Sequence, residues 1–279
     1  MERLADLHIH TTASDGALSP TQIVRAAADA RLAAIAITDH DNIDGIDEAL
    51  AAGREMGVEV IPGIELSAIH GDKVEVHVLG YYIDHHKESF VSRLKILCEA
   101  RTERGRKIVE QLNQVGVPIS FDRVMAIAGG GAVGRPHVAK ALVELGVVSG
   151  IDSAFGKYLV EGTPGFVPRY KISPAEAVAM IIDAGGVPCC AHVAKLNRED
   201  LLVELKDRGL RGIEVEHPDH TPAGARYYRK FAAKHDLIAT GGSDAHCHPG
   251  GKAPGVGGVA VPYEVVELIK GAAGICRDE

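Results

Sequence analysis

The sequence predicts an α/β fold in which mostly parallel strands form an open sheet or a closed barrel. Short apolar runs without alternation recur along the 279-residue chain, as expected for strands buried on both faces. Amphipathic helical patterns separate these runs, and this alternation of strand and helix favours a parallel sheet. Seven runs are visible, enough for a barrel: 4–8, 33–37, 58–62, 73–81, 187–191, 212–215 and 237–240.

The helices between these strands carry signals at both ends. Ser19 and Ser173 each precede a proline and are followed three residues later by Gln22 or Glu176, which is the pattern of a capping box at a helix start. Glycines follow the helical stretches, as C-terminal caps do. These are Gly57, Gly116, Gly146, Gly185 and Gly209.

One segment breaks the alternation after the fourth strand. From 87 to 168 the pattern is helical only. The expected helices there cover 87–115, 121–128, 136–145 and 153–159. We therefore expect an all-helical subdomain, 87–168, inserted into a barrel built from 1–86 and 169–279.

The composition restricts the class of protein. Hydrophobic residues make up 46% and charged residues 24%, and a net charge of −8 argues against a long nucleic-acid duplex as partner. No run of 18 apolar residues and no apolar leader is present, so neither a membrane span nor a signal peptide is predicted. Five cysteines lack the spacing of a disulfide framework, which predicts a reduced, cytoplasmic protein.

Fourteen histidines, many of them beside carboxylates, point to metal chemistry. Polar side chains stand at or after the predicted strands, and the carboxyl ends of parallel strands form the rim that carries a barrel's active site. In strand order they are His8, His10 and Asp15; Asp39, His40 and Asp41; Glu65; His77; His192; Glu214, Glu216 and His217; and Asp244 and His246. Such regular placement predicts a single metal-binding rim.

His8 and His10 form a specific local pattern. Residues i and i+2 of a strand point to the same face, so both imidazoles can bind one ion. Imidazole suits Zn, Mn and Fe, whereas carboxylates favour harder ions and can bridge two of them. The alternative, histidines that only cap the barrel through hydrogen bonds, is disfavoured because desolvating so many unpaired imidazoles is costly.

The opening stretch Asp6–Gly16, DLHIHTTASDG, resembles the first motif of the PHP family, the polymerase and histidinol phosphatase domain. Later segments are similar to its other motifs, in order: Thr38–Asp41, Gly63–Glu65, His77–Tyr81, Ala191–His192 and Gly242–His246. The resemblance covers nearly the whole chain and implies a distorted (β/α)7 TIM-like barrel. Val193 departs from the family pattern, which has proline after the fifth-strand histidine.

The resemblance also implies two or three divalent ions of Mn, Zn or Fe. One ion would take His8, His10, Glu65 and Asp244. A second would share Glu65 and add His77 and His192, and a third would take Asp15, His40 and His246. Glu65, Asp244 and His246 would hold the attacking metal-bound hydroxide.

The helical insert resembles that of the subgroup containing 3′,5′-nucleoside bisphosphate phosphatases and enzymes that trim short RNA from its 5′ end. Gly134–His137 and Phe155–Leu159 carry this resemblance. Lone cations in a helical segment are usually solvated, but Arg135, His137 and Lys157 together suit a phosphate clamp, because arginine donates in bidentate fashion to phosphate.

The sequence leaves two roles open for several polar residues. Asp39 either orients His40 or caps the following turn, and His217 could reach the substrate without a fixed metal role. Arg101 and Arg104 share a helical face that either contacts substrate or is solvated. Other histidines lie away from the motifs and are expected to be solvated: His70, His85, His86, His220 and His235.

Together these features predict a metal-dependent phosphoesterase in which metal-activated hydroxide attacks phosphorus. The expected substrate is small and phosphorylated, most specifically the 3′-phosphate of a 3′,5′-bisphosphonucleotide (pAp to AMP), or a short oligoribonucleotide. Two alternatives stay open: another phosphomonoesterase, such as histidinol-phosphate phosphatase, and a non-catalytic binding module. The helical insert argues against another phosphomonoesterase, since a small monoester needs no second clamp. The full set of ligands argues against a non-catalytic module.

Overall fold

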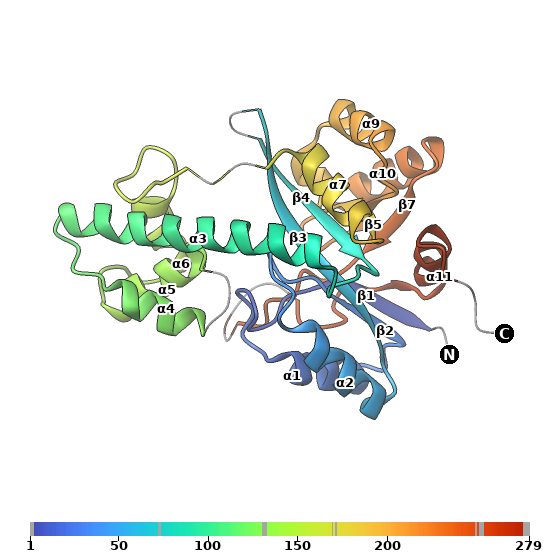
Figure 1. Ribbon diagram of the computed structural model, residues 1–279, viewed down its shortest axis with the longest axis horizontal. Coiled ribbons are helices and arrows are strands. Elements are labelled where there is room, and N and C mark those ends of the chain that lie inside the picture. The colour runs from blue at the N-terminus through green and yellow to red at the C-terminus, as the bar shows by residue number, and fades with distance from the viewer. Residues whose placement is uncertain are drawn as a thin grey trace.

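In the part of the chain that the structure describes, eight strands form one mixed sheet that curls into a nearly closed barrel with helices around it (Figure 1). The computed structural model describes residues 3–71, 74–129, 133–168, 170, 172–248, 250 and 254–275. The strands are β1 (Leu4–Ile9), β2 (Ala34–Ile37), β3 (Glu59–His70), β4 (Val74–Tyr81), β5 (Val187–Cys190), β6 (Gly212–Glu216), β7 (Ile238–Gly241) and β8 (Val261–Pro262). Their order is β7-β6-β5-β4-β3-β2-β1-β8, and a parallel bridge between Ile9 and Ala245 brings the β1 and β7 ends together.

The predicted α/β barrel is confirmed, but its strands are not all parallel. β4 runs antiparallel to both β3 and β5, and the short β8, which was not predicted, runs antiparallel to β1. Only residues 71–73 separate β3 from β4, which is too few for the crossover that parallel strands need. The predicted third strand, 58–62, was also too short: β3 continues to His70, so Glu65 lies inside the strand and not after it.

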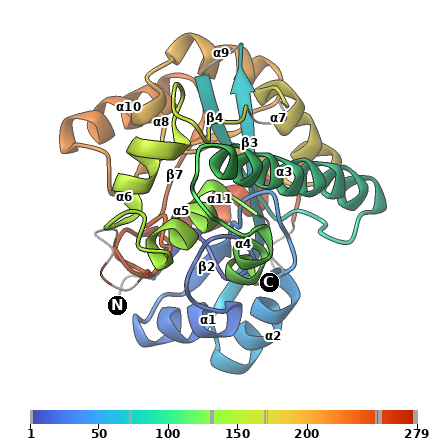
Figure 2. The same ribbon diagram turned by 90° about the vertical axis from the view of Figure 1, so that its left-hand side faces the viewer.

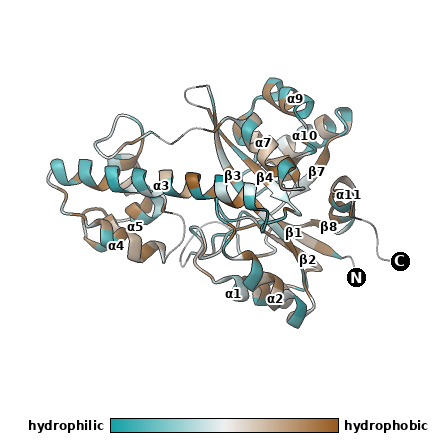
Figure 3. Cartoon of the chain, viewed as in Figure 1, coloured by the Kyte–Doolittle hydropathy of each residue, from teal (hydrophilic) through white to brown (hydrophobic). Residues whose placement is uncertain are grey.

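Helices cover the outside of the barrel. They are α1 (Pro20–Asp29), α2 (Ile46–Met56), α7 (Pro174–Asp183), α8 (Val193–Leu196), α9 (Glu199–Asp207), α10 (Pro222–Lys234) and α11 (Glu264–Ala272). Both predicted capping boxes are present, at Ser19 and at Ser173. Figure 3 shows hydrophobic residues along β1 and β2. None of the helices that the structure describes has the length and apolar character that a membrane crossing needs.

Between β4 and α7 the chain forms helices that extend to one side of the barrel, at the left of Figure 1 and facing the viewer in Figure 2. They are α3 (Glu88–Gln114), α4 (Phe121–Ala128), α5 (Arg135–Glu144), α6 (Ile151–Ala154) and the π-helix η1 (Phe155–Leu159). Their buried residues form a separate hydrophobic cluster that includes Leu112, Val124 and Leu142. The first half of α3 instead packs into the barrel core through Phe90 and Leu94.

Candidate metal centre

The predicted ligands converge on one side chain, Glu65 of β3, which is only 1% exposed. Imidazole nitrogens from β1 and β4 and from the loops after β1, β2 and β5 surround its carboxylate. The distances to a Glu65 oxygen are 3.4 Å for His8, 3.4 Å for His10, 2.9 Å for His40, 2.7 Å for His77 and 3.3 Å for His192. One buried carboxylate therefore contacts five of the predicted ligands.

The two oxygens of Glu65 face different histidines. Oε2 lies against His8, His10 and His40, whereas Oε1 lies against His77 and His192. This division would suit a carboxylate that binds a different ion through each oxygen. The antiparallel direction of β4 does not remove His77 from the site, because it lies opposite Ser67, two residues beyond Glu65 on β3.

Asp244 faces the same group from the loop after β7. Its Oδ1 lies 3.0 Å from His10 Nε2 and 3.5 Å from His8 Nε2, so the four residues predicted for the first ion lie together. Its Oδ2 lies 3.3 Å from His217 Nε2. His217 therefore borders the centre, next to His8 and Glu214.

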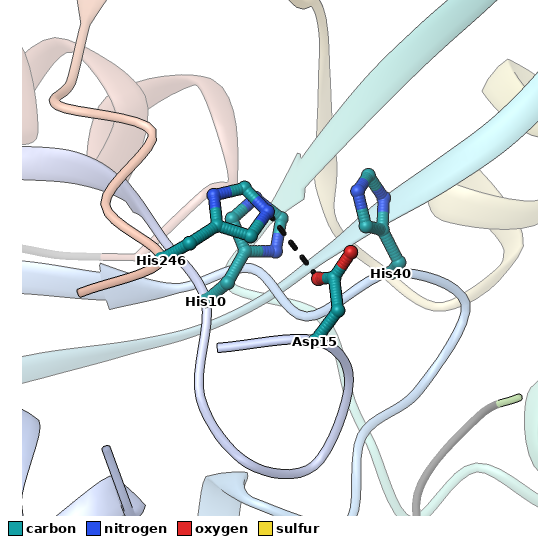
Figure 4. Close-up of side chains that lie close together, drawn as sticks. All are labelled: His10, Asp15, His40 and His246. Atoms are coloured by element: carbon teal, nitrogen blue, oxygen red, sulfur yellow. Dashed lines mark ion pairs between the residues drawn. The ribbon is translucent and has the colours of Figure 1, made fainter. Parts of the chain in front are cut away.

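A further group stands beside these residues (Figure 4). His10, Asp15, His40 and His246 each offer a ligand atom, and these atoms lie within 4.8 Å of one another. His246 Nε2 is 3.3 Å from Asp15 Oδ1, and its ring stacks on that of His10 with centroids 4.2 Å apart. The three residues predicted for a third ion thus lie together, and His10 and His40 connect them to Glu65.

Unsatisfied buried atoms test whether these side chains fit metal ions. His8 Nε2, His10 Nδ1, Asp15 Oδ1, His40 Nδ1 and Glu65 Oε2 are buried without a hydrogen-bond partner. Leaving such atoms unpaired is costly unless another partner satisfies them. Ligands bound at about 2.1 Å to one ion lie about 3.0–3.4 Å apart, which matches the separations of His8, His10 and His192 from Glu65 and of His10 from Asp244. The donor set and its spacing therefore fit divalent ions.

The buried carboxylates and histidines of the cluster shift one another's pKa values. Burial alone would raise the pKa of Glu65, but His40, His77 and His8 outweigh it and hold that pKa well below its usual range. Burial, together with His246 and His40, lowers the pKa of His10 to about 4. Although burial opposes it, Glu65 raises the pKa of His77 to about 9. Since metal ligands must be deprotonated, we expect ion binding to release protons at neutral pH.

Three buried carboxylates hold the predicted ligands in place, and sequence reasoning assigned this role to neither Glu214 nor Asp6. Glu214 of β6 lies 2.9 Å from His8 Nδ1 and accepts the His192 backbone N–H at 2.7 Å. Asp6 accepts from Ser243 and Gly257 and so fixes the loop that carries Asp244. Asp39 accepts from Thr11 and Ser14 and so fixes the earlier turn that carries Asp15, a role that neither of its two interpretations included.

We expect Glu214→Gln to weaken metal binding about 10–100-fold, because loss of a group that orients a ligand typically has that effect. Metal titration of the purified variant measures it. Glu216→Gln is the matched control, since Glu216 lies on the same strand but pairs with Arg229 outside the cluster. Equal affinity of Glu214→Gln and the wild type would contradict the orienting role.

The three predicted clamp residues differ in their exposure and in their distance from the metal cluster. Arg135, at the start of α5, is 21% exposed, lies over the ring of Phe155 and has Nη2 3.8 Å from Glu75, which also contacts His77. His137 is buried, and its Nδ1 accepts the Gly134 N–H at 3.0 Å. Lys157 is exposed on η1, and none of the contacts given by the described residues brings it to the cluster.

Burial lowers the pKa of His137 to about 4, against the opposing influence of Asp15 and the Ser14 backbone, so this ring is neutral at pH 7. It can donate or accept a hydrogen bond there but supplies no charge. Two cations of the insert also lie within electrostatic reach of Asp15: Arg101, which pairs with Asp41, and Lys140, whose pKa burial lowers. The sequence left open whether Arg101 contacts substrate or is solvated. Lys140 was missed because it belongs to no motif.

Comparisons with known proteins agree with this geometry. Residues 6–121 match the PHP domain family. The 3′,5′-nucleoside bisphosphate phosphatase of Chromobacterium violaceum is 35% identical over 91% of this chain and 88% of its own length. A 5′-3′ exoribonuclease of Haemophilus influenzae is 34% identical, covering 88% of this chain and 91% of its own. A solved structure from Bifidobacterium adolescentis, inferred to be a metal-dependent phosphoesterase, covers 96% of both chains with a TM-score of 0.89 and 33% identity.

Proposed function

Because this chain belongs to the PHP domain family and is a metal-dependent phosphoesterase, we propose that it removes the 3′-phosphate of 3′,5′-bisphosphonucleotides such as pAp, leaving a 5′-nucleotide. The observation that supports this substrate is the position of the insert's basic side chains. Arg135 contacts Glu75 next to the ligand His77, and Arg101 and Lys140 lie near the ligand Asp15. A molecule with one phosphate at the metal cluster would therefore meet cations for a second phosphate.

In this proposal the cluster around Glu65 holds two or three ions of Mn, Zn or Fe. The ligands are those predicted from the sequence: His8, His10, Asp15, His40, Glu65, His77, His192, Asp244 and His246. When bound, such ions polarise phosphoryl oxygens and lower the pKa of water. The protein's own contribution is to fix the ligands, through Glu214, Asp6 and Asp39, and to orient the substrate.

The insert, 87–168, serves in this proposal as the substrate-binding wall of the barrel, 1–86 and 169–279. Arg135 would bind the 5′-phosphate through charge-assisted hydrogen bonds, which are about twice as strong as neutral ones. His137 would position α5 by bonding the Gly134 N–H and would add a neutral donor at most. Lys157 would reach the substrate only if its exposed side chain folds back over the site.

A short oligoribonucleotide with a 5′-phosphate is the second candidate, supported by the exoribonuclease relative. It carries the same two groups, a 5′-phosphate and a phosphate ester on the 3′ oxygen, so one clamp and one metal cluster serve both substrates. The two differ only in what lies beyond the scissile phosphate. A net charge of −8 favours such short molecules over long nucleic acids.

A substrate comparison with Mn²⁺ supplied tests the proposal. We expect kcat/KM for pAp to exceed that for histidinol phosphate about tenfold to a hundredfold or more, the worth of one charge-assisted phosphate contact. A 5′-phosphorylated dinucleotide measures the oligoribonucleotide activity in the same assay. Equal rates on pAp and histidinol phosphate would remove the bisphosphate assignment while leaving a phosphoesterase.

A further inference from the structure

A second cluster of metal-ligating side chains lies away from the Glu65 group and shares no residue with it. Asp47 stands in the first turn of α2, and His85 and His86 lie in the loop between β4 and α3. Each of the three offers a ligand atom, and these atoms lie within 4.8 Å of one another. We propose that Asp47, His85 and His86 form a second, surface site for a divalent ion of the Zn²⁺ class.

The distances are those of ligands that share an ion. His85 Nε2 lies 3.0 Å and His86 Nε2 lies 3.4 Å from the same oxygen, Asp47 Oδ1. Ligands held at about 2.0–2.1 Å in tetrahedral geometry stand about 3.3 Å apart. Both imidazoles therefore already approach the carboxylate at ligand spacing, with ring centroids 4.1 Å apart.

The loop that carries the two histidines is fixed by its own hydrogen bonds. The Asp84 backbone N–H donates to the Ala184 carbonyl at 2.8 Å, which ties the loop to the end of α7. The Asp84 side chain accepts the His86 N–H at 3.1 Å. His85 is only 12% exposed, so the expectation that it is a solvated surface residue was wrong. An ion would thus meet ligands whose backbone is already positioned.

The donor set indicates which ion would bind. Two imidazole nitrogens and one carboxylate suit Zn²⁺, Ni²⁺ or Cu²⁺ better than Mg²⁺ or Ca²⁺, which prefer oxygen ligands. Three protein ligands leave at least one position for water, as in open zinc sites. Since Asp47 and His86 are 68% and 70% exposed, the ion would exchange with solvent. It would link α2 to the start of α3.

The simpler role for these residues is a hydrogen-bonded tie without metal, and Zn²⁺ titration separates the two. The enzyme is first saturated with Mn²⁺, and Zn²⁺ binding is then followed by calorimetry, with bound zinc measured after gel filtration. We expect the wild type to bind one more equivalent of Zn²⁺ than His86→Ala or Asp47→Asn. Both substitutions are at exposed positions and should leave the fold intact. Zn²⁺ should also raise the Tm of the wild type more than that of either variant.

His235→Ala serves as the control, because it removes a histidine from the end of α10, outside both clusters. Any zinc that enters the Glu65 group is common to all variants, so the difference between them isolates the surface site. Removing a direct ligand should weaken this site at least about tenfold, since even an indirect partner typically contributes that much. Equal zinc stoichiometry and affinity in all four proteins would overturn the proposal and leave the hydrogen-bonded tie.

Discussion

Glu65→Gln is expected to release ions from more than one position and to reduce kcat/KM about 1,000-fold or more. Five of the histidines proposed as ligands contact this carboxylate, three through Oε2 and two through Oε1. An amide of the same shape keeps the packing but loses the negative charge that a bridging ligand supplies. Metal ions contribute several kcal/mol to such reactions, and each 1.36 kcal/mol is tenfold in rate.

Metal analysis after gel filtration, with turnover and circular dichroism on the same sample, measures this effect. Asp244→Ala is the informative comparison, because Asp244 contacts His8 and His10 but neither His77 nor His192 among the ion pairs of the described residues. We expect it to lose most activity and fewer ions than Glu65→Gln. If Glu65→Gln lost only a single ion, the bridging role would be rejected. A variant that kept full metal content and rate would remove the ligand assignment itself.

Arg135→Ala is expected to lower kcat/KM for pAp about tenfold to a hundredfold and to leave hydrolysis of p-nitrophenyl phosphate nearly unchanged. A hydrogen bond to a charged group is worth about 1.5–3 kcal/mol, and 1.4 kcal/mol is tenfold. The generic ester has one phosphate, so it gains nothing from a second binding group. Steady-state kinetics on both substrates gives the contrast directly.

Arg123→Ala is the matched control for Arg135→Ala. Arg123 lies in the same helical insert, but it forms an exposed ion pair with Glu144. We expect both substrates to be hydrolysed by this variant at wild-type rates. Equal losses on both substrates in Arg135→Ala would indicate damage to the site as a whole, and the bisphosphate assignment would lose its main support.

The strands and most helices could be predicted because their signals are local. Apolar runs mark buried strands, and the capping boxes at Ser19 and Ser173 mark helix starts. The direction of β4 was missed because apolar periodicity is the same for parallel and antiparallel strands. The predicted third strand, 58–62, concealed the direction of β4. The short gap of residues 71–73, which permits only a hairpin, becomes visible only once β3 continues to His70.

The ligands could be proposed from the sequence because metal binding restricts residue type as well as spacing. Strand ends bring His8, Glu65 and Asp244 together, whatever the details of the loops between them. The supporting residues were harder to find, because a buried carboxylate such as Glu214 differs from an exposed one only in its surroundings. His85 and Asp47 lie 38 positions apart, and no pattern in the sequence joins them.

The continuity of α3 gives the insert a fixed reach. Phe90 and Leu94 of this helix belong to the barrel core, while Ile108 and Leu112 belong to the core of the insert. Its 27 residues contain no proline, and at 1.5 Å per residue it is about 40 Å long. A sharp bend would break helical hydrogen bonds, so this helix holds the insert at one distance from the barrel. The ion pair between Arg101 and Asp41 ties the middle of the helix to the barrel. The distance between Arg135 and the Glu65 cluster is then set by the fold before any ligand binds.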